Sequence, residues 1–204
     1  MAHERVEPRP GLVTSTSRRP PATEPPEAAP HDTGAWRRLD TPIGTLVLEA
    51  CGGALTAVRF AGAHGPEGGV APRLPRTGSA SPAGAALETA AVELEEYFTR
   101  RRRVFTVTLA PRGTAFQCRV WRALCRVPYG ATVSYGELAR RAGHAGAARA
   151  VGRANACNPL AVLVPCHRVV GGAGALTGYG GGLEAKRLLL DLEAGPGAAG
   201  AVTP

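Results

Sequence analysis

Apolar and polar residues alternate along the first half of the chain in a pattern that predicts a small α/β region. Residues 43–50 alternate like a strand, Gly52-Gly53 supplies a turn, and residues 55–60 alternate like a returning strand, which together predict a β-hairpin. Residues 85–98 carry apolar side chains at helical spacing and predict a helix. Residues 105–109 alternate again and predict a further strand.

The pattern becomes helical in the second half. Thr114 is a candidate N-cap for a helix over residues 116–126. Ser134 is a candidate N-cap for a helix over residues 135–142, with Glu137 placed as in a capping box. The second half is therefore expected to be mostly α-helical.

Two more helices and a loop complete this pattern. Gly143 ends the preceding helix, and another is expected over residues 145–156, so that a tight glycine-containing turn joins two short helices. Such a pair is typical of a helix-turn-helix motif. A flexible loop is expected over residues 171–182 and a closing helix over residues 183–193.

The helix expected over residues 145–156 has unusually little side-chain bulk. Its two arginines, Arg149 and Arg153, stand four residues apart and therefore on one face. A smooth basic helix fits either against a neighbouring helix or in a groove between phosphate strands, and the pattern alone leaves both interpretations open. The small residues are Ala145, Gly146, Ala147, Ala148, Ala150, Gly152 and Ala154.

One apolar run, residues 160–164, predicts a short buried strand that ends at Pro165, because proline has no N–H to donate. Cys166 follows, with His167 and Arg168 beside it. A cysteine reacts as its thiolate, and a neighbouring histidine or arginine lowers its pKa. Cys166 is therefore a candidate nucleophile. The alternative is that it is only a small buried apolar residue.

Composition divides the chain into four parts. Residues 1–33 are rich in Pro, Glu, Ala, Ser and Thr and poor in large apolar residues, which predicts a disordered tail. An α/β domain without a visible catalytic constellation is expected over residues 34–110. The domain with the helices and the cysteine motif is expected over residues 111–196, and residues 197–204 form a short tail.

The net charge is +8 and is unevenly distributed. Residues 110–204 carry ten Arg and one Lys against four acids, a net charge of +7. Positive charge around the cysteine motif suits a polyanionic partner such as nucleic acid, although a basic composition also serves solubility alone. The basic run at residues 100–103 has the simpler explanation of a solvated helix end, where cations meet the C-terminal dipole.

The cysteines form no Cys-x-x-Cys pair, and no spacing of Cys and His suggests a metal site, so we expect neither a metal nor a cofactor. No signal segment and no apolar run of membrane length is present. We therefore expect a reduced, cytoplasmic protein with no membrane partner. The five cysteines are Cys51, Cys118, Cys125, Cys157 and Cys166.

The cysteine motif also resembles that of a known family. Pro-Cys-His-Arg-Val-Val at residues 165–170, with Asn158-Pro159 before it and Gly-Tyr-Gly-Gly-Gly at residues 178–182 after it, resembles the active-site segment of the O6-alkylguanine-DNA alkyltransferases (methylated-DNA–protein-cysteine methyltransferases). The resemblance is strong over residues 114–193 and weak over residues 36–110. It implies a monomer with a ribonuclease H-like N-terminal α/β domain and a mostly α C-terminal domain containing the helix-turn-helix.

The resemblance implies a DNA-repair reaction at Cys166. This cysteine would take the alkyl group from O6-alkylguanine, or O4-alkylthymine, in double-stranded DNA, in a single-turnover suicide reaction. Glu193 would orient His167, and His167 would deprotonate a water that takes the thiol proton. Asn158 would tie the turn between the recognition helix and the active-site strand. Without the resemblance, Glu193 would be interpreted as an exposed carboxylate at a helix end.

The resemblance also implies DNA-binding and pocket residues. Arg149 would fill the gap left by a flipped base, and Tyr135 would push the neighbouring phosphate. Tyr179 would form part of the alkylguanine pocket. The small residues entering the minor groove would be Ala147, Ala148, Ala150 and Gly152. The other pocket residues would be Val169, Ala161 and Gly180, of which the last two replace a proline and a serine found in other members.

A second hypothesis, from a different class, is a non-enzymatic DNA-binding protein: a helix-turn-helix regulator, or a lesion sensor without transfer chemistry. The joint presence of Cys166, His167, Asn158 and Glu193 favours the enzyme, because family members that only sense lesions lack the cysteine. Cys157, directly before Asn158, is either a second reactive thiol or an inert one.

Overall fold

The structure is a computed structural model that describes residues 34–62 and 81–195 of the 204-residue chain. The expected tails at residues 1–33 and 197–204 lie outside the described residues. All described residues belong to one compact unit. No helix among them is long and apolar enough to cross a membrane.

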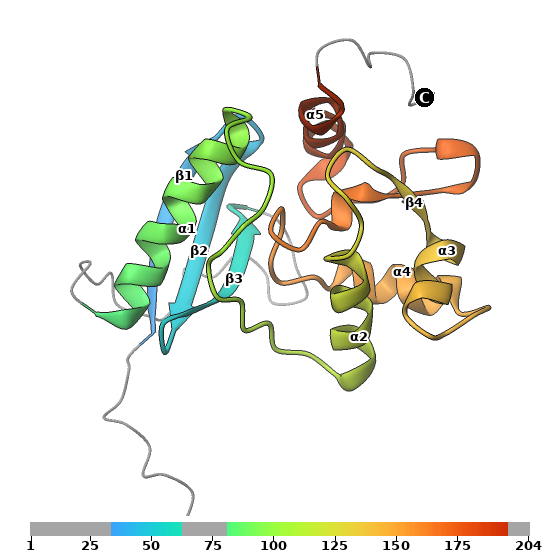
Figure 1. Ribbon diagram of the computed structural model, residues 1–204, viewed down its shortest axis with the longest axis horizontal. Helices are drawn as coiled ribbons and strands as arrows, with labels where there is room; N and C mark the ends of the chain where they lie inside the picture. Colours follow the sequence, from blue (N-terminus) through green and yellow to red (C-terminus); the bar gives the residue numbers. More distant parts are fainter. Residues whose placement is uncertain (1–33, 63–80, 196–204) are drawn as a thin grey trace, which may run out of the picture. The chain divides into compact units, whose positions relative to one another are not determined.

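An antiparallel three-stranded sheet with one helix against it forms the first half of the described chain (Figure 1). Its strands in spatial order are β1 (Ala35–Thr41), β2 (Gly44–Cys51) and β3 (Ala54–Phe60). Helix α1 (Pro82–Phe98) packs against all three. The β2–β3 pair confirms the predicted hairpin. Strand β1 was not predicted, because the polar pair Arg37-Arg38 interrupts its apolar pattern.

The N-cap residue Ser81 sets the beginning of helix α1. The Ser81 side chain accepts a hydrogen bond from the Gly84 N–H (3.0 Å). Pro82 follows at the first helical position, where the missing N–H leaves nothing unsatisfied. The helix therefore starts three residues before the predicted residue 85. Its last turn brings Tyr97 into the core, where the side chain is fully buried.

The predicted strand at residues 105–109 is wrong. Only Leu109 pairs with the sheet, through a single parallel bridge to Leu55 on β3. The Glu93 carboxylate of α1 accepts hydrogen bonds from both the backbone N–H (3.0 Å) and the hydroxyl of Thr106. A side chain thus satisfies a backbone donor that a strand would give to its neighbour.

The second half is mostly helical, as predicted, with one small sheet. Its helices are α2 (Ala115–Leu124), α3 (Tyr135–Arg141), α4 (Ala148–Ala156) and α5 (Gly182–Ala194), with short 3₁₀ turns at Cys166–Arg168 and Gly172–Gly174. Two-residue strands β4 (Val133–Ser134) and β5 (Val169–Val170) pair in parallel. In Figure 1, α3 and α4 lie beside α2, and all three helices contact one another.

Both predicted helix caps are present. Thr114 forms a complete capping box at the start of α2. Ser134 accepts a hydrogen bond from the Glu137 N–H (3.2 Å), but the Glu137 carboxylate pairs with Arg140 and Arg141 instead of returning to the cap. Helix α4 has no side-chain cap and begins three residues later than the predicted residue 145.

Residues 160–164 form a buried turn, so the predicted strand is wrong here as well. Leu160 makes one bridge to Val58 of β3, and the chain then turns back, with the Val164 N–H donating to the Leu160 carbonyl oxygen (2.9 Å). Val162 has a φ of 72°, a left-handed conformation that a β-branched residue rarely adopts. Periodicity does not identify the backbone conformation of a short, wholly apolar run.

A single hydrophobic core joins the two halves of the described chain. It extends from Leu48 in the sheet and Tyr97 on α1 to Trp121 on α2 and Leu189 on α5. Trp121 also donates its Nε1–H to the Ala154 carbonyl oxygen of α4 (2.9 Å). The sheet therefore supports the helical half from within a shared interior.

We expect Val162→Gly to destabilise the protein by about 1–2 kcal/mol less than Val164→Gly, since a left-handed conformation costs a side chain about that much and glycine almost nothing. The two valines are equally buried, with 1% and 2% of their surface exposed, so both substitutions lose similar apolar burial. Urea unfolding measures the difference. Equal losses would show that Val162 is not strained.

Candidate active site

Cys166 lies in the first position of the 3₁₀ turn that follows Pro165. Its N–H donates to the Val164 carbonyl oxygen (2.7 Å), and only 6% of the residue is exposed. The Asn158 side-chain amide lies 3.1 Å from the sulfur. The candidate nucleophile is therefore held inside the protein, with one polar group directed at it.

Asn158 fixes the whole turn that leads to the cysteine. Its Nδ2 donates to the Val164 carbonyl oxygen (2.8 Å), and its Oδ1 accepts the Leu160 N–H (3.0 Å). The same Nδ2 contacts the Cys166 sulfur. One amide thus spans the turn and reaches the thiol. The neighbouring Asn155 adds a longer contact to the Cys166 carbonyl oxygen (3.4 Å).

His167 is fully buried beside Cys166. Its Nε2 lies 3.0 Å from Oε1 of Glu193. Its Nδ1 is buried and has no hydrogen-bond partner among the described residues. Because an ionised carboxylate only accepts, Nε2 carries the proton and Nδ1 carries the lone pair. Burial lowers the pKa of His167 more than the bond to Glu193 raises it, so the ring is a neutral base at pH 7.

Glu193 of α5 accepts hydrogen bonds from three separate parts of the chain. Oε1 accepts from the Tyr97 hydroxyl (2.7 Å), from His167 and from Arg168 Nη2 (2.8 Å). Oε2 accepts from Arg168 Nε (2.8 Å) and from the Gly130 N–H (3.0 Å). Burial would raise the pKa of this carboxyl, but the bonds from His167 and Arg168 outweigh it and lower the pKa to about 2. Glu193 is buried and ionised, and the exposed alternative is wrong.

His167 and Arg168 were expected to lower the pKa of the Cys166 thiol, and the structure does not show a lowered pKa. Burial raises the pKa of Cys166, and the opposing bond from Asn158 is the weaker influence. Arg168 turns away from the sulfur to Glu193 and to the Val127 carbonyl oxygen (2.6 Å). Cys166 is therefore a protonated thiol at rest, and its reaction needs a base.

Tyr179, one of the expected pocket residues, contacts this cluster. Its ring makes edge contacts with His167 and with Phe60 of β3, at centroid distances of 6.5 and 5.6 Å. Its hydroxyl is buried without a hydrogen-bond partner in the described part of the chain. Of the other expected pocket residues, Val169 and Ala161 are buried and Gly180 is exposed.

Lys186 of α5 is a further buried charged side chain near these residues. Its Nζ donates to the carbonyl oxygens of Val169 (2.5 Å) and Thr177 (3.0 Å). Burial lowers its pKa, and the negative charge that Cys166 acquires on ionisation opposes this. Lys186 therefore joins β5 to the loop that carries Tyr179.

The small residues of α4 do not all face outward. Arg149, Arg153 and Ala150 are exposed, whereas Gly152 is half-buried. A Cβ on Gly152 would lie 3.5 Å from the ring of Tyr135, which occupies the first turn of α3. Expected residues Ala147 and Ala148 are also half-buried, at the beginning of the helix.

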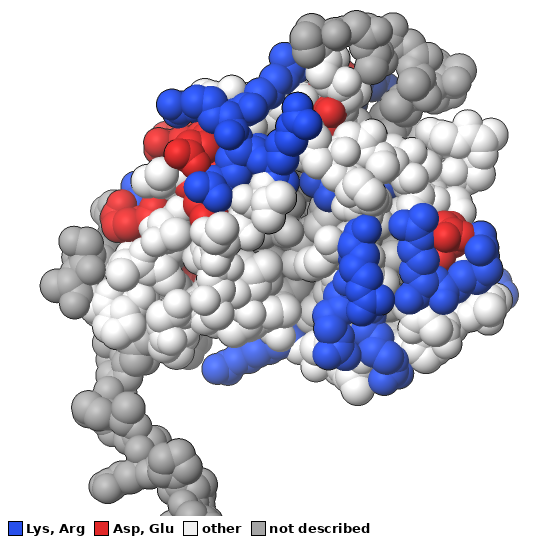
Figure 2. All heavy atoms as spheres, in the orientation of Figure 1, with Lys and Arg blue, Asp and Glu red and all other residues white. Residues whose placement is uncertain are grey.

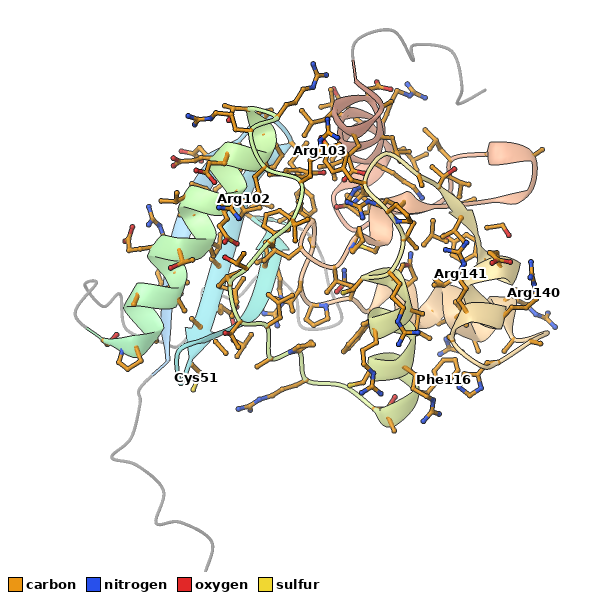
Figure 3. The ribbon with its side chains drawn as sticks, viewed as in Figure 1. Cys51, Arg102, Arg103, Phe116, Arg140 and Arg141 are labelled. Carbon is orange, nitrogen blue, oxygen red and sulfur yellow. The ribbon has the colours of Figure 1, made fainter. Side chains whose placement is uncertain are left out.

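Basic side chains gather in two places on the face drawn in Figure 2, one near the end of α1 and one over α2 and α3. Figure 3 labels Arg102 and Arg103 in the first group and Arg140 and Arg141 in the second. Arg102 is paired with Glu93 and Glu96, so part of the first group is neutralised. Among residues 34–62 and 81–195, no group of three His, Cys, Asp or Glu side chains could hold a metal ion.

Two family models match the two halves of the chain described above. Residues 35–111 match the ribonuclease-like domain of 6-O-methylguanine DNA methyltransferase, and residues 115–195 match the DNA binding domain of the same protein. The chain belongs to this methyltransferase family. The family expected from the cysteine motif is therefore confirmed.

Relatives of known activity agree with the family models. The methylated-DNA–protein-cysteine methyltransferase of Mycobacterium tuberculosis (strain H37Rv) is 47% identical over 163 residues, which cover 78% of this chain and 91% of that protein. The crystal structure of M. tuberculosis O6-methylguanine methyltransferase has a TM-score of 0.69 at 45% identity, covering 79% and 93% of the two chains. A second M. tuberculosis structure, in complex with DNA, has a TM-score of 0.69 at 46% identity, covering 78% and 92%.

Three residues of the methyltransferase site were not identified from the sequence. Tyr97 was assigned no role, since its hydroxyl meets Glu193 only in the folded chain. Gly130 combines a φ of 75° with an N–H directed at the same carboxylate, and a turn glycine in the sequence does not reveal the second property. Lys186 is the only lysine of the chain, and this rarity is the one signal in the sequence that could have indicated a role for it.

We expect Glu193→Gln to destabilise the methyltransferase by about 3 kcal/mol, because it leaves the Arg168 charge buried without a counter-charge. Asp191→Asn is the matched control, since Asp191 lies on the same helix and is exposed. We expect less than about 0.5 kcal/mol for this surface change. Urea unfolding at pH 7 compares the two, and equal losses would contradict the central place of Glu193.

Proposed function

We propose that this methyltransferase moves the alkyl group of O6-alkylguanine, and of O4-alkylthymine, in duplex DNA to its own Cys166. The observation that carries the proposal is the buried pair of the neutral His167 ring and the ionised Glu193, which begins at the residue directly after Cys166. A purely DNA-binding protein has no need of a base beside a buried thiol. The relative solved in complex with DNA supports DNA as the partner.

The proposed reaction begins with a proton relay. Adjacent residues on a chain do not face each other in a helical turn, so a water between Nδ1 of His167 and the Cys166 sulfur would carry the proton. His167 takes a proton from that water, and the water takes the thiol proton. Glu193, held ionised by Arg168, stabilises the imidazolium that results.

The thiolate then attacks the alkyl carbon attached to O6. A C–S bond forms at Cys166 as the C–O bond breaks, and the electron pair of that bond remains on the purine oxygen. The purine anion takes a proton, through water, from the His167 imidazolium and becomes guanine, which returns His167 to its neutral form. The thioether formed has no group beside it that would cleave it, so each protein molecule reacts once and irreversibly.

The proposed DNA interface is the α3–turn–α4 unit, used as a helix-turn-helix. Arg149 and Arg153 on the exposed side of α4 would contact the duplex, and the small residues between them would allow close approach. The target base has to leave the stack to reach a buried sulfur, at a cost of a few kcal/mol that is lower for a base already weakened in its pairing. Arg149 would fill the space left behind, and Tyr135 would contact the neighbouring phosphate.

The decisive test is the mass of the intact protein after incubation with a duplex that contains one O6-methylguanine. We expect one added methyl group per protein molecule, located at Cys166 by peptide mapping. Cys166→Ser should gain no mass and still bind the duplex, because a hydroxyl fills the site but is a far weaker nucleophile. The matched control Cys157→Ser, which removes an exposed thiol nine residues earlier, should react like the wild type. A methyl group elsewhere, or tight binding without transfer, would refute the proposal and favour a lesion sensor.

The pH dependence of the transfer rate tests the base. Burial lowers the pKa of His167 from its ordinary 6.5, so the ring remains unprotonated throughout the neutral range. Since protonation removes the base, we expect a constant rate above pH 6.5 and a decline only as pH falls below it. The measurement is the single-turnover rate at saturating methylated duplex. A decline that is already under way at pH 7.5 would contradict His167 as the base.

A further inference from the structure

Tyr135 connects the proposed DNA-binding helices to the loop beside the active site. Its ring rests against Gly152 of α4, and its hydroxyl lies 2.9 Å from the Thr177 hydroxyl. Thr177 belongs to the segment that continues into Tyr179. The residue proposed to contact a DNA phosphate is therefore hydrogen-bonded to the segment that carries Tyr179.

Thr177 is held from two sides. Its carbonyl oxygen accepts a hydrogen bond from the buried Lys186, which also holds Val169 of β5. This internal bond is shielded from DNA. Its hydroxyl is bonded to Tyr135, and this second bond is open to competition from a ligand at α3.

The segment after Thr177 covers the reactive centre. The ring of Tyr179 contacts the ring of His167, the residue directly after Cys166. With Cys166 only 6% exposed, a purine reaches the sulfur only after part of this cover moves. Tyr179 lies between Gly178 and Gly180, and a Cβ added at either glycine would meet nothing within 4 Å. Glycine restricts the backbone less than any other residue, so this segment has few steric barriers to a change of conformation.

We propose that Thr177 is a specificity-determining residue that makes alkyl transfer depend on DNA. In the free protein its hydroxyl and Tyr135 hold the Tyr179 segment closed. A phosphate beside Tyr135 only accepts hydrogen bonds, so the tyrosine must donate to it and release Thr177. A hydrogen bond to an ionised acceptor is roughly twice as strong as a neutral one, so the exchange favours release. The pocket wall then opens where a base is being presented, and a free base meets it closed.

This inference rests on the proposed function, and one comparison of two substrates tests it. The transfer rate to Cys166 is measured with the free base O6-methylguanine and with the methylated duplex, using Thr177→Val, which keeps the shape and removes the hydroxyl. We expect the free-base rate to rise about fivefold, the equivalent of one neutral hydrogen bond. The duplex rate should stay within about twofold, because DNA already breaks that bond. Thr177→Ser keeps the hydroxyl and should behave as the wild type.

Tyr135→Phe tests whether the free-base rate depends on the Tyr135–Thr177 hydrogen bond and not on Thr177 alone. It should raise the free-base rate by the same factor as Thr177→Val, and the double variant should show no further rise, since both changes remove one bond. In the duplex reaction, by contrast, Tyr135→Phe should be slower than Thr177→Val, because it also loses the phosphate contact. Independent, additive effects with the free base would overturn the proposal.

Amide hydrogen exchange of residues 178–181 provides a readout that needs no alkyl transfer. An undamaged duplex should speed exchange in the wild type, and Thr177→Val should exchange fast without DNA. An unchanged free-base rate together with unchanged exchange in Thr177→Val would refute the role of Thr177. Absence of transfer from the methylated duplex to the wild type would instead refute the proposed function, so the two failures are distinguishable.

Discussion

The buried carboxylate of Glu193 is the interaction on which the rest of the site depends. Its two oxygens collect donors from α1 (Tyr97), from the turn before β4 (Gly130) and from the cysteine turn (His167 and Arg168). A carboxylate without these donors could not remain charged in the interior. The sheet half and the helical half must therefore pack together in one arrangement before all donors can reach the Glu193 carboxylate. This requirement gives the N-terminal half a chemical contribution through Tyr97, in addition to support.

The resting state of Cys166 follows from the same environment. Burial raises its pKa, and the arginine beside it in sequence is occupied by Glu193. A protonated, buried thiol is a poor target for oxidants and for chance alkylating agents, since reactivity follows the thiolate and its exposure. For a protein that would use its cysteine once, protection until a proper substrate arrives is an advantage. The relay proposed through His167 would supply the thiolate only where an alkylated nucleobase can also be bound.

The helices and the first hairpin could be predicted because their signals are local. Thr114 and Ser134 cap their helices through residues three positions away, and Gly52-Gly53 sits between strands that pair directly. The turn at residues 160–164 could not, since its shape is imposed by the Asn158 amide and by β3, which lies a hundred residues earlier. The same limit applies to the site. Cys166 and His167 are recognisable from their motif, whereas Tyr97 on α1 and the direction of Arg168 are decided only by the tertiary fold.

Two hydrogen-bond systems with opposite properties meet at this cysteine. The one around Glu193 is charged and buried, and both oxygens of the carboxylate accept hydrogen bonds, so the carboxylate is held in one arrangement. The one that runs from Tyr135 to Thr177 is neutral and partly exposed, so a stronger acceptor can replace either partner. Lys186 lies on the buried side, where its amine donates hydrogen bonds to both β5 and the loop. If the Tyr135–Thr177 bond is exchanged as proposed, the geometry around Cys166 would stay fixed while access to the sulfur would depend on the bound DNA.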